Sequence, residues 1–182
     1  GLTVPMENVA AFKNSILKII KNEKLKNKIS EACIEIIKRD FSFRHYLFDL
    51  LDYLHFGYKK VSVIVPNYNY EQYIDQRLKT ISEQNYPLYE IIFLDDCSKD
   101  KSLNKARHFL NKSNIDFGIH PNTKNSKSVI SQWKKGADLA SGNYIWIAEA
   151  DDYSDHNFVS EIIKPFDDPK MVLSYCESNQ MN

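Results

Sequence analysis

The sequence predicts an α/β protein with a mostly parallel sheet and an N-terminal α-helical extension. From residue 59 onward, short runs of apolar and β-branched residues alternate with longer amphipathic segments. Strands that are apolar along their whole length are typical of a parallel sheet with helices on both faces. Residues 7–56 instead repeat apolar side chains at helical spacing. We therefore expect a helical extension or linker at 1–58 and an α/β domain at 59–182.

The extension is expected to form three helices. Apolar residues recur every three or four positions across 12–20, 25–37 and 43–54, and neither glycine nor proline occurs between Met6 and Phe56. The lysine-rich run at 21–28 is expected to be a solvated turn and helix face.

The α/β domain is expected to alternate five strands with four helices. The expected strands are the apolar runs at 61–65, 91–94, 115–120 and 171–175 and the run that follows Gly142, and the expected helices are 71–84, 102–110, 128–140 and 158–166. Trp133 and Trp146 are expected in the core.

Composition narrows the class of protein. The chain has 182 residues, of which 43% are hydrophobic and 26% charged, as in ordinary globular proteins. Its 24 basic and 24 acidic residues leave no net charge, so we expect no nucleic-acid partner. Three cysteines without metal-ligand spacing indicate free thiols in a reducing compartment. With no signal peptide or membrane span in the sequence, we expect a cytoplasmic protein, free or peripheral at the inner face of the membrane.

Polar residues follow three of the expected strands. They are the segments Pro66-Asn-Tyr-Asn69, Asp95-Asp96 and Glu149-Ala-Asp-Asp152. Ligands of parallel sheets bind outside the carboxyl ends of the strands. We therefore expect these three segments to converge on one site.

The acidic segment after the fourth strand indicates a metal. Glu149, Asp151 and Asp152 crowd the end of a buried strand, where they repel one another and lose solvation. Mg²⁺ or Mn²⁺ would compensate them, because these cations take oxygen ligands, usually one or two carboxylates plus water and substrate phosphates. The segment thus predicts a diphosphate ligand, and a solvated acidic turn is the simpler alternative.

Other candidate contacts each have a structural alternative. No Gly-x-Gly-x-x-Gly and no Walker lysine occur, so the phosphates must be held in another way. Asp95 and Asp96 either anchor a ribose or base or cap the next helix. Tyr68 either stacks on a base or packs locally. Lys124 and Lys127 either neutralise a diphosphate or are surface lysines.

Four motifs in order resemble the nucleotide-binding half of family 2 glycosyltransferases. They are Val61-Ser-Val-Ile-Val-Pro-Asn-Tyr-Asn69, Gln84-Asn-Tyr-Pro87, Glu90-Ile-Ile-Phe-Leu-Asp-Asp-Cys-Ser98 and Ser141-Gly-Asn-Tyr-Ile-Trp-Ile-Ala-Glu-Ala-Asp-Asp152. The resemblance implies a truncated GT-A fold, a Rossmann-like arrangement that binds a nucleotide-diphospho-sugar, with a UDP-sugar as the expected donor. The implied reaction is inverting transfer of the sugar to a hydroxyl of a glycan or glycolipid acceptor.

The same resemblance implies roles for individual residues. Pro66 and Tyr68 would border the base and Asp96 would bind it. Asp151 would face Mn²⁺ or Mg²⁺, while Glu149 or Asp152 would contact ribose, the metal or metal-bound water. Asn69 and Lys127 complete the expected nucleotide-sugar contacts.

Three positions depart from the family pattern. Glu149 stands where the family more often has Asp, and its longer side chain changes the first contact. Cys97 replaces the usual glycine after the acidic pair, and 122–127 lacks the glycine commonly seen there. Since glycine adopts backbone conformations that other residues avoid, the loop at Cys97 is expected to be more constrained than usual. The missing glycine at 122–127 leaves open which lysine lies on the pyrophosphate side.

The ends of the chain suggest a longer parent. In the family, the acceptor pocket and the catalytic base lie beyond the fifth strand, so the base is expected beyond Asn182 and the fragment is expected to be inactive alone. The front end loosely resembles the closing helices of family 4 glycosyltransferases, which have the GT-B fold. The matching segments are Val4–Asn8, the helix to Ile20, Asn22–Leu25, Ile29–Ile37 and Arg39–Ser42. A tandem glycosyltransferase module upstream is therefore one expectation, and a linker packed on the sheet domain is the other.

Two alternatives to an active transferase stay open from sequence. One is a scaffold domain that keeps the fold but has a degenerate donor site. The other is a phosphohydrolase or receiver-like domain, which needs an isolated nucleophilic Asp and a lysine at a later strand end. Asp95 fits that role poorly, and no such lysine follows Val172.

Overall fold

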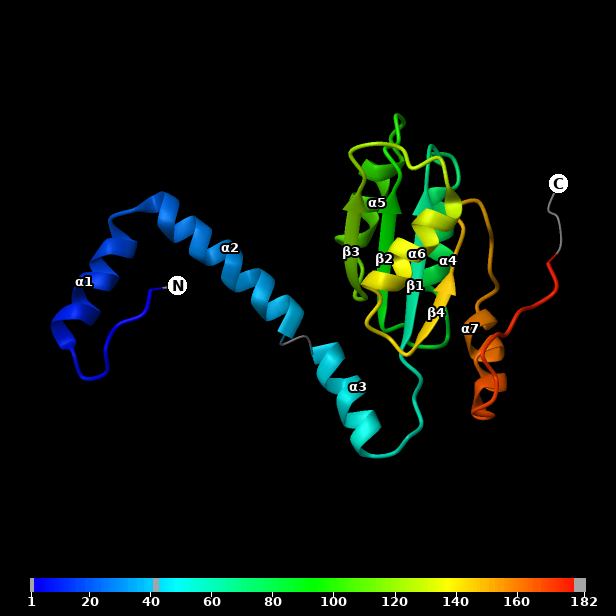
Figure 1. Cartoon of the computed structure of the whole chain (residues 1–182), viewed down its shortest axis with the longest axis horizontal. Coiled ribbons are helices and arrows are strands. Elements are labelled where there is room, and N and C mark those ends of the chain that lie inside the picture. Colours follow the sequence, from blue (N-terminus) through cyan, green and yellow to red (C-terminus); the bar gives the residue numbers. More distant parts are fainter. Residues whose placement is uncertain (1, 41–42, 179–182) are drawn as a thin grey trace. The chain divides into compact units, whose positions relative to one another are not determined.

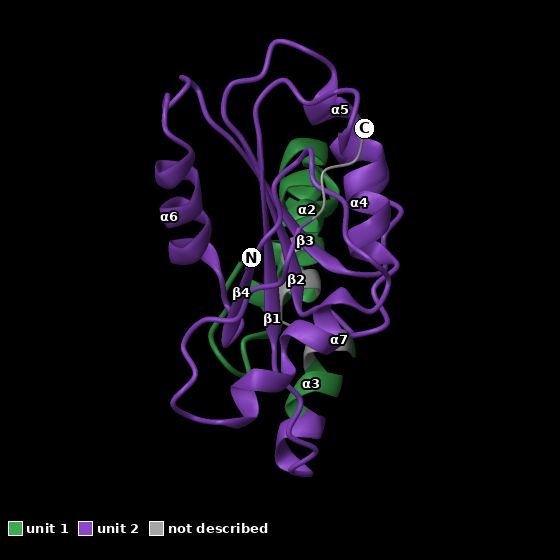
Figure 2. Ribbon diagram, turned by 90° about the vertical axis from the view of Figure 1, so that its right-hand side faces the viewer, with its two compact units in different colours: residues 1–49 green, residues 50–182 purple. Residues whose placement is uncertain are grey.

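A computed structural model describes residues 2–40 and 43–178 of the chain. The chain forms two compact units, residues 1–49 and 50–182, which are coloured separately in Figure 2. The boundary between them falls within one helix, α3, Phe43–Tyr53. The expected division at 58/59 stays a prediction.

The first unit is helical, as its periodicity predicts. Helix α1 spans Val9–Ile20 and α2 spans Glu23–Asp40. The side chain of Asn8 caps α1 by accepting a hydrogen bond from the Ala11 N–H at 2.8 Å, and Asn22 accepts one from the Leu25 N–H at 2.9 Å at the start of α2. None of the side chains described in α1 and α2 is buried.

The second unit is built on a parallel sheet, which confirms the predicted fold class. Its strands run in the order β3-β2-β1-β4, with every neighbouring pair parallel (Figure 1). Their bounds are Val61–Asn67 for β1, Glu90–Asp95 for β2, Asp116–Pro121 for β3 and Tyr144–Ile147 for β4. Because β1 lies between β2 and β4, the carboxyl ends of these three strands are neighbours.

Helices cover the two faces of the sheet unequally. Helices α4 (Ile74–Ser82), α5 (Ser102–Leu110) and α7 (Phe158–Ile162) lie on one face, and α6 (Val129–Leu139) lies on the other (Figure 2). The larger core is on the α4 side, where alternate residues of β1 and β2, such as Val63 and Phe93, are fully buried. The core on the α6 side is smaller and consists of Ile64, Ile92 and Leu94, with Ala140 packed against them.

Helix α6 lies very close to β1 because it has a glycine at the contact. A β-carbon at Gly136 would come within 2.4 Å of Ile64 Cγ2, whereas carbon atoms in contact are about 3.5–4.0 Å apart. This close contact fixes how near α6 lies to the sheet.

The structure corrects the predicted fifth strand. Residues 171–178 form no strand, and Val172 and Tyr175 are almost fully exposed. The run has the apolar, β-branched composition of a strand, but it pairs with neither β3 nor β4, the two edge strands. Composition alone does not make a strand, because the backbone also needs a hydrogen-bonding partner.

Two other differences are local. Helix α4 begins at residue 74 rather than 71, and the Glu71 N–H before it donates to Asp100 at 2.9 Å. The last helix ends at Ile162 and continues as a 3₁₀ helix, Lys164–Asp167, at Pro165, which lacks an N–H.

Two further features are the state of the cysteines and the hydropathy of the helices. Cys33, Cys97 and Cys176 all carry free thiols. Over residues 2–40 and 43–178, no helix combines the length and the hydropathy that a membrane crossing requires.

Candidate functional site

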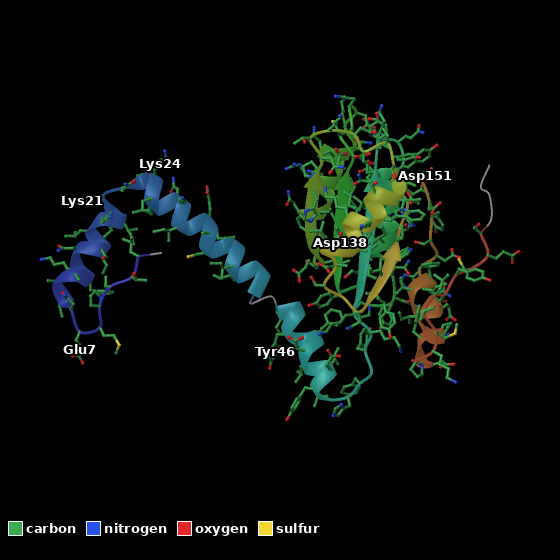
Figure 3. The ribbon with its side chains drawn as sticks, viewed as in Figure 1. Glu7, Lys21, Lys24, Tyr46, Asp138 and Asp151 are labelled. Atoms are coloured by element: carbon green, nitrogen blue, oxygen red, sulfur yellow. The ribbon has the colours of Figure 1, made fainter. Side chains whose placement is uncertain are left out.

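The three polar segments predicted from sequence lie at one edge of the sheet. We call this the carboxyl edge, formed by residues 66–69 after β1, 95–98 after β2 and 148–154 after β4. The last of these segments is called the acidic loop below. Figure 3 shows Asp151 beyond the end of β4 at this edge.

The loops after β1 and β2 are joined by a buried amide. Asn67 Nδ2 donates to Asp95 Oδ1 at 2.9 Å and to the hydroxyls of Ser98 and Ser102 at 3.1 and 2.9 Å. The Ser98 N–H in turn donates to Asp95 Oδ2 at 3.1 Å. Asp95 is only 2% exposed, so its carboxylate organises the two loops. It is not an accessible nucleophile, which removes the basis of the receiver-like alternative.

Asp96 accepts hydrogen bonds from the loop that precedes α6. Its Oδ1 accepts from Asn122 Nδ2 at 2.7 Å, the Ser126 N–H at 2.9 Å and Gln132 Nε2 at 3.0 Å. Its Oδ2 accepts from the Ser126 N–H at 3.0 Å and the Ser126 hydroxyl at 2.8 Å. A carboxylate offers about four acceptor positions, so Asp96 is saturated by the protein. A base contact through Asp96 therefore requires segment 122–126 to give up part of this bonding.

Glu149 is held by the same helix that reaches Asp96. The indole N–H of Trp133 donates to Glu149 Oε1 at 2.6 Å. Partial burial raises the pKa of Glu149, the Trp133 hydrogen bond lowers it, and the charges of Asp151 and Asp152 raise it further. Gln132 and Trp133 are adjacent on α6. One turn of this helix therefore contacts both the acid that follows β2 and the acid that follows β4.

Asp151 and Asp152 are the exposed acids of the carboxyl edge. The Tyr70 hydroxyl is hydrogen-bonded to Asp151, and the pKa of Tyr70 is raised by burial and by the negative charge of Asp151. The two carboxylates are thus more accessible to a ligand than Asp95 or Asp96.

A buried arginine lies behind the acidic loop. Arg77 of α4 is 2% exposed, and its Nη1 donates to the Ser154 hydroxyl at 3.2 Å. Its guanidinium lies 5.1 Å from the centre of the Trp146 ring. Burial lowers the pKa of Arg77 to about 10, against the opposing influence of Asp152, Glu149 and Asp151, so the side chain stays charged at neutral pH.

Three non-glycine residues with left-handed backbone lie in the loops of the carboxyl edge or in the neighbouring loop before α6. Asn69, Cys97 and Lys127 have φ values of 60°, 65° and 56°. Asparagine tolerates this region, while cysteine and lysine do so at a cost. Cys97 stands where the family commonly has glycine, and Lys127 lies in the segment that lacks one. The expected constraint on the Cys97 loop is therefore visible as backbone strain, and Lys127 has the same strained backbone.

Some buried polar atoms near this edge have no partner. Within the part of the chain that the structure describes, the buried side-chain atoms that lack a hydrogen bond are Asn67 Oδ1, Arg77 Nε and Gln132 Oε1. Each belongs to a residue that contacts the carboxyl edge. Unsatisfied buried groups are rare in folded proteins and are often found at functional sites.

The donor atoms at this edge suit a hard divalent cation. Among the described residues, no three Asp, Glu, His or Cys side chains lie close enough to enclose a metal by themselves. Mg²⁺ and Mn²⁺ bound with phosphates typically use only one or two protein carboxylates. Asp151, with either Glu149 or Asp152, provides oxygens of the required kind.

The remaining predicted residues are placed as follows. Pro66 is buried near the end of β1, and Tyr68 and Asn69 are exposed at the carboxyl edge. Lys127 is exposed in the loop that precedes α6. Lys127 contributes its backbone N–H to Asn125 Oδ1 at 2.8 Å.

Several residues at this edge were missed by sequence reasoning. Trp133, expected in the core, is instead 36% exposed and bonded to Glu149, and Trp146 is half-buried against the larger core. Arg77 and Gln132 gave no distinct signal, because charged and polar residues are ordinary on amphipathic helices.

The fold and this edge together define a class of protein: a Rossmann-like α/β domain with acidic residues at the carboxyl edge of its sheet, at a topological switch point. Residues 62–179 match the family model described as Glycosyl transferase family 2. The chain belongs to glycosyl transferase family 2, and its sheet has the GT-A fold of that family.

Curated relatives share the matched region. The chain is 32% identical over 96 residues to the poly(ribitol-phosphate) beta-N-acetylglucosaminyltransferase TarS of Staphylococcus aureus, covering 52% of this chain and 16% of TarS. It is 32% identical over 94 residues to the putative teichuronic acid biosynthesis glycosyltransferase TuaG of Bacillus subtilis, covering 50% of this chain and 36% of TuaG. The chain thus spans well under half the length of these relatives.

Solved structures agree on the fold. The crystal structure of S. aureus TarS 1-349 in complex with UDP-GlcNAc superposes with a TM-score of 0.55 at 27% identity, covering 59% of this chain and 31% of that one. The mannosyltransferase PcManGT of Pyrobaculum calidifontis, in complex with GDP-Man and Mn²⁺, gives a TM-score of 0.57 at 25% identity, covering 61% and 33%.

Proposed function

We propose that this domain binds a nucleotide-diphospho-sugar through a divalent cation and takes part in transfer of the sugar to a hydroxyl of a glycan or glycolipid. The observation that carries the proposal is the convergence at the carboxyl edge. Adjacent residues of α6, Gln132 and Trp133, donate to Asp96 after β2 and to Glu149 after β4. The acids that follow two separate strands therefore lie close to the same turn of α6.

The proposed roles follow from accessibility. Asp151, with Glu149 or Asp152, would hold Mn²⁺ or Mg²⁺, and the cation would stabilise the charge of the leaving diphosphate. Pro66, Tyr68 and Asn69 would border the nucleotide, and Lys127 is the proposed cation on the phosphate side. Asp96 would bind the base once Ser126 and its neighbours release one of its oxygens.

The donor proposed here is a UDP-sugar. Support comes from the related TarS structure, which is in complex with UDP-GlcNAc. Inversion at the anomeric carbon is proposed from the family resemblance. The acceptor hydroxyl would attack as the nucleoside diphosphate leaves.

Binding of UDP with and without Mn²⁺ tests the proposal. We expect calorimetry to show UDP binding that Mn²⁺ strengthens, and we expect Asp151→Asn to remove most of that strengthening, because an amide does not compensate the charge of a cation. The matched control is Asp138→Asn, the same change on an exposed residue near the end of α6 (Figure 3). It should bind UDP and Mn²⁺ like the unchanged chain.

The contradicting result separates this proposal from the scaffold alternative. If UDP gives no heat with or without Mn²⁺, both for this chain and for a longer chain that contains it, the domain is a scaffold with a degenerate donor site. If UDP binds but Asp151→Asn leaves the effect of Mn²⁺ unchanged, the metal is not held at the acidic loop.

A further inference from the structure

Arg77 is a buried charge that packing alone does not explain. It lies on α4, on the larger-core side of the sheet, and is 2% exposed. Its Nε has no hydrogen-bond partner in the described part of the chain. Replacing a buried ion by an apolar side chain of similar volume is often neutral or stabilising. A buried guanidinium with an unsatisfied N–H therefore suggests a role other than stability.

The contacts of Arg77 are with the strand and loop that carry the acidic residues. Its Nη1 donates to Ser154, which is two residues beyond Asp152 and is itself buried. Its guanidinium carbon lies over the ring of Trp146, which is three residues before Glu149. Arg77 thus contacts the chain just before and just after the proposed metal-binding carboxylates.

The end of α4 strengthens this connection. Gln84 Nε2 donates to the Asp155 carbonyl at 2.6 Å, and Gln84 Oε1 accepts from the Val159 N–H at 2.9 Å. The Asn85 N–H donates to the His156 carbonyl at 2.9 Å. The segment that leaves the acidic loop is therefore fixed at several points to α4 and to the residues just after it. Among these contacts, the one from Arg77 is nearest in sequence to the carboxylates.

We propose that Arg77 is a positioning residue for Asp151 and Asp152: it holds the acidic loop, through Ser154 and Trp146, in the conformation that receives a cation together with a diphosphate. This inference rests on the proposed function. Arginine suits the task because its planar, always-charged group can stack on an aromatic ring and donate a hydrogen bond at the same time. Its charge also offsets the repulsion among the three carboxylates before a cation arrives.

The test separates positioning from general stability. The dissociation constant of UDP is measured by calorimetry on the full 182-residue chain, once with EDTA and once with Mn²⁺, and the ratio of the two constants is the metal enhancement. The variants are Arg77→Met, Arg77→Lys and Ser154→Ala. Arg107→Met is the matched control, because Arg107 is an exposed arginine on α5.

We expect Arg77→Met to reduce the metal enhancement by roughly 10- to 100-fold, as loss of a group that orients a metal ligand typically does. UDP binding in EDTA should change by less than about twofold, because without a cation the acidic loop contributes little. Ser154→Ala should give a smaller loss in the same direction, and Arg77→Lys should recover part of it. Arg107→Met should leave both constants unchanged.

Two results would overturn the inference. One is a normal metal enhancement in Arg77→Met and Ser154→Ala. The other is a parallel loss of UDP binding in EDTA and in Mn²⁺, which a purely structural role predicts. If Arg77→Met does not fold by circular dichroism, Ser154→Ala and Arg77→Lys decide by the same criteria. Absence of metal enhancement both in the unchanged chain and in a longer chain that contains it would instead reject the proposed function.

Discussion

At the scale of single residues, the acids of the carboxyl edge divide into two kinds. Asp95 and Asp96 are buried and surrounded by neutral donors from Asn67, Ser126 and their neighbours. Asp151 and Asp152 are exposed. Since a saturated carboxylate has little capacity left for a ligand, the first pair mainly orders the loops and the second pair is available for binding.

The cost of the left-handed backbone at Cys97 can be measured by substitution. A residue with a β-carbon at φ 65° costs about 1–2 kcal/mol relative to one that is relaxed there. Glycine removes that cost but loses about 0.5–1 kcal/mol through its freedom in the unfolded chain. We expect Cys97→Gly to raise the free energy of unfolding by about 0.5–1 kcal/mol, measured by urea denaturation.

The control for that substitution is Cys97→Ala, which keeps the β-carbon and therefore the strain. It loses only the weak contact of the thiol with the Thr123 carbonyl at 3.7 Å, so it should change stability by less than about 0.5 kcal/mol. Equal stabilisation by glycine and alanine would mean that the thiol, not the backbone, is unfavourable at this position.

The position of the site could be predicted from sequence, but its supporting contacts could not. Apolar runs that end in acids place Asp96 and Asp151 at strand ends, and parallel pairing brings strand ends to one edge. Arg77 and Trp133 lie on helices, and which face of a helix meets the loops depends on how the helix packs on the sheet. A single sequence does not give that orientation.

At the scale of elements, α6 connects the acids of the two strands, so its contact with β1 is decisive. Alanine at Gly136 gains about 1 kcal/mol of helix propensity, but its β-carbon would lie 2.4 Å from Ile64 Cγ2 and 2.8 Å from Cδ1. Ile64 is fully buried and cannot move away freely. Overpacking of this kind costs about 1–3 kcal/mol, so we expect a net loss of stability for Gly136→Ala, measured by urea denaturation.

The same substitution can be placed in a background that has room for it. Ile64→Ala removes both clashing atoms, so Gly136→Ala should be neutral or favourable when added to it. In the chain with Ile64 intact, displacement of α6 should also weaken UDP binding, because Gln132 and Trp133 move with the helix. Equal costs in both backgrounds would show that the contact does not limit the approach of α6.

The helices and strands were predicted correctly where the sequence pattern fits an element and that element also has a packing or pairing partner. The four strands and the alternating helices follow from apolar runs and helical spacing, and the structure confirms them. The fifth strand failed because residues 171–175 have strand composition but no pairing partner. Trp133 failed as a core residue because the sheet beneath α6 offers only a small apolar surface, formed by Ile64, Ile92 and Leu94.

At the scale of the whole molecule, the two units differ in how they are stabilised. The second unit has a contiguous core between the sheet and helices α4, α5 and α7. In the first unit, none of the side chains described in α1 and α2 is buried, and apolar residues such as Phe12, Ile20 and Ile37 are exposed. Isolated helices of this length are marginal in water, so tertiary burial is what makes a helix of a globular protein stable.

This difference predicts that the α/β domain does not depend on the first two helices. Removing residues 1–42 deletes no side chain described as buried and leaves α3 and the sheet complete. We expect residues 43–182 to unfold cooperatively with a free energy within about 1 kcal/mol of the full chain, to bind UDP and Mn²⁺ equally well, and to be more soluble because exposed apolar residues are lost. Urea denaturation and calorimetry on both chains measure this. A loss of several kcal/mol in the free energy of unfolding, or a loss of metal-dependent UDP binding, would show that residues 1–42 are part of the folding unit of the α/β domain.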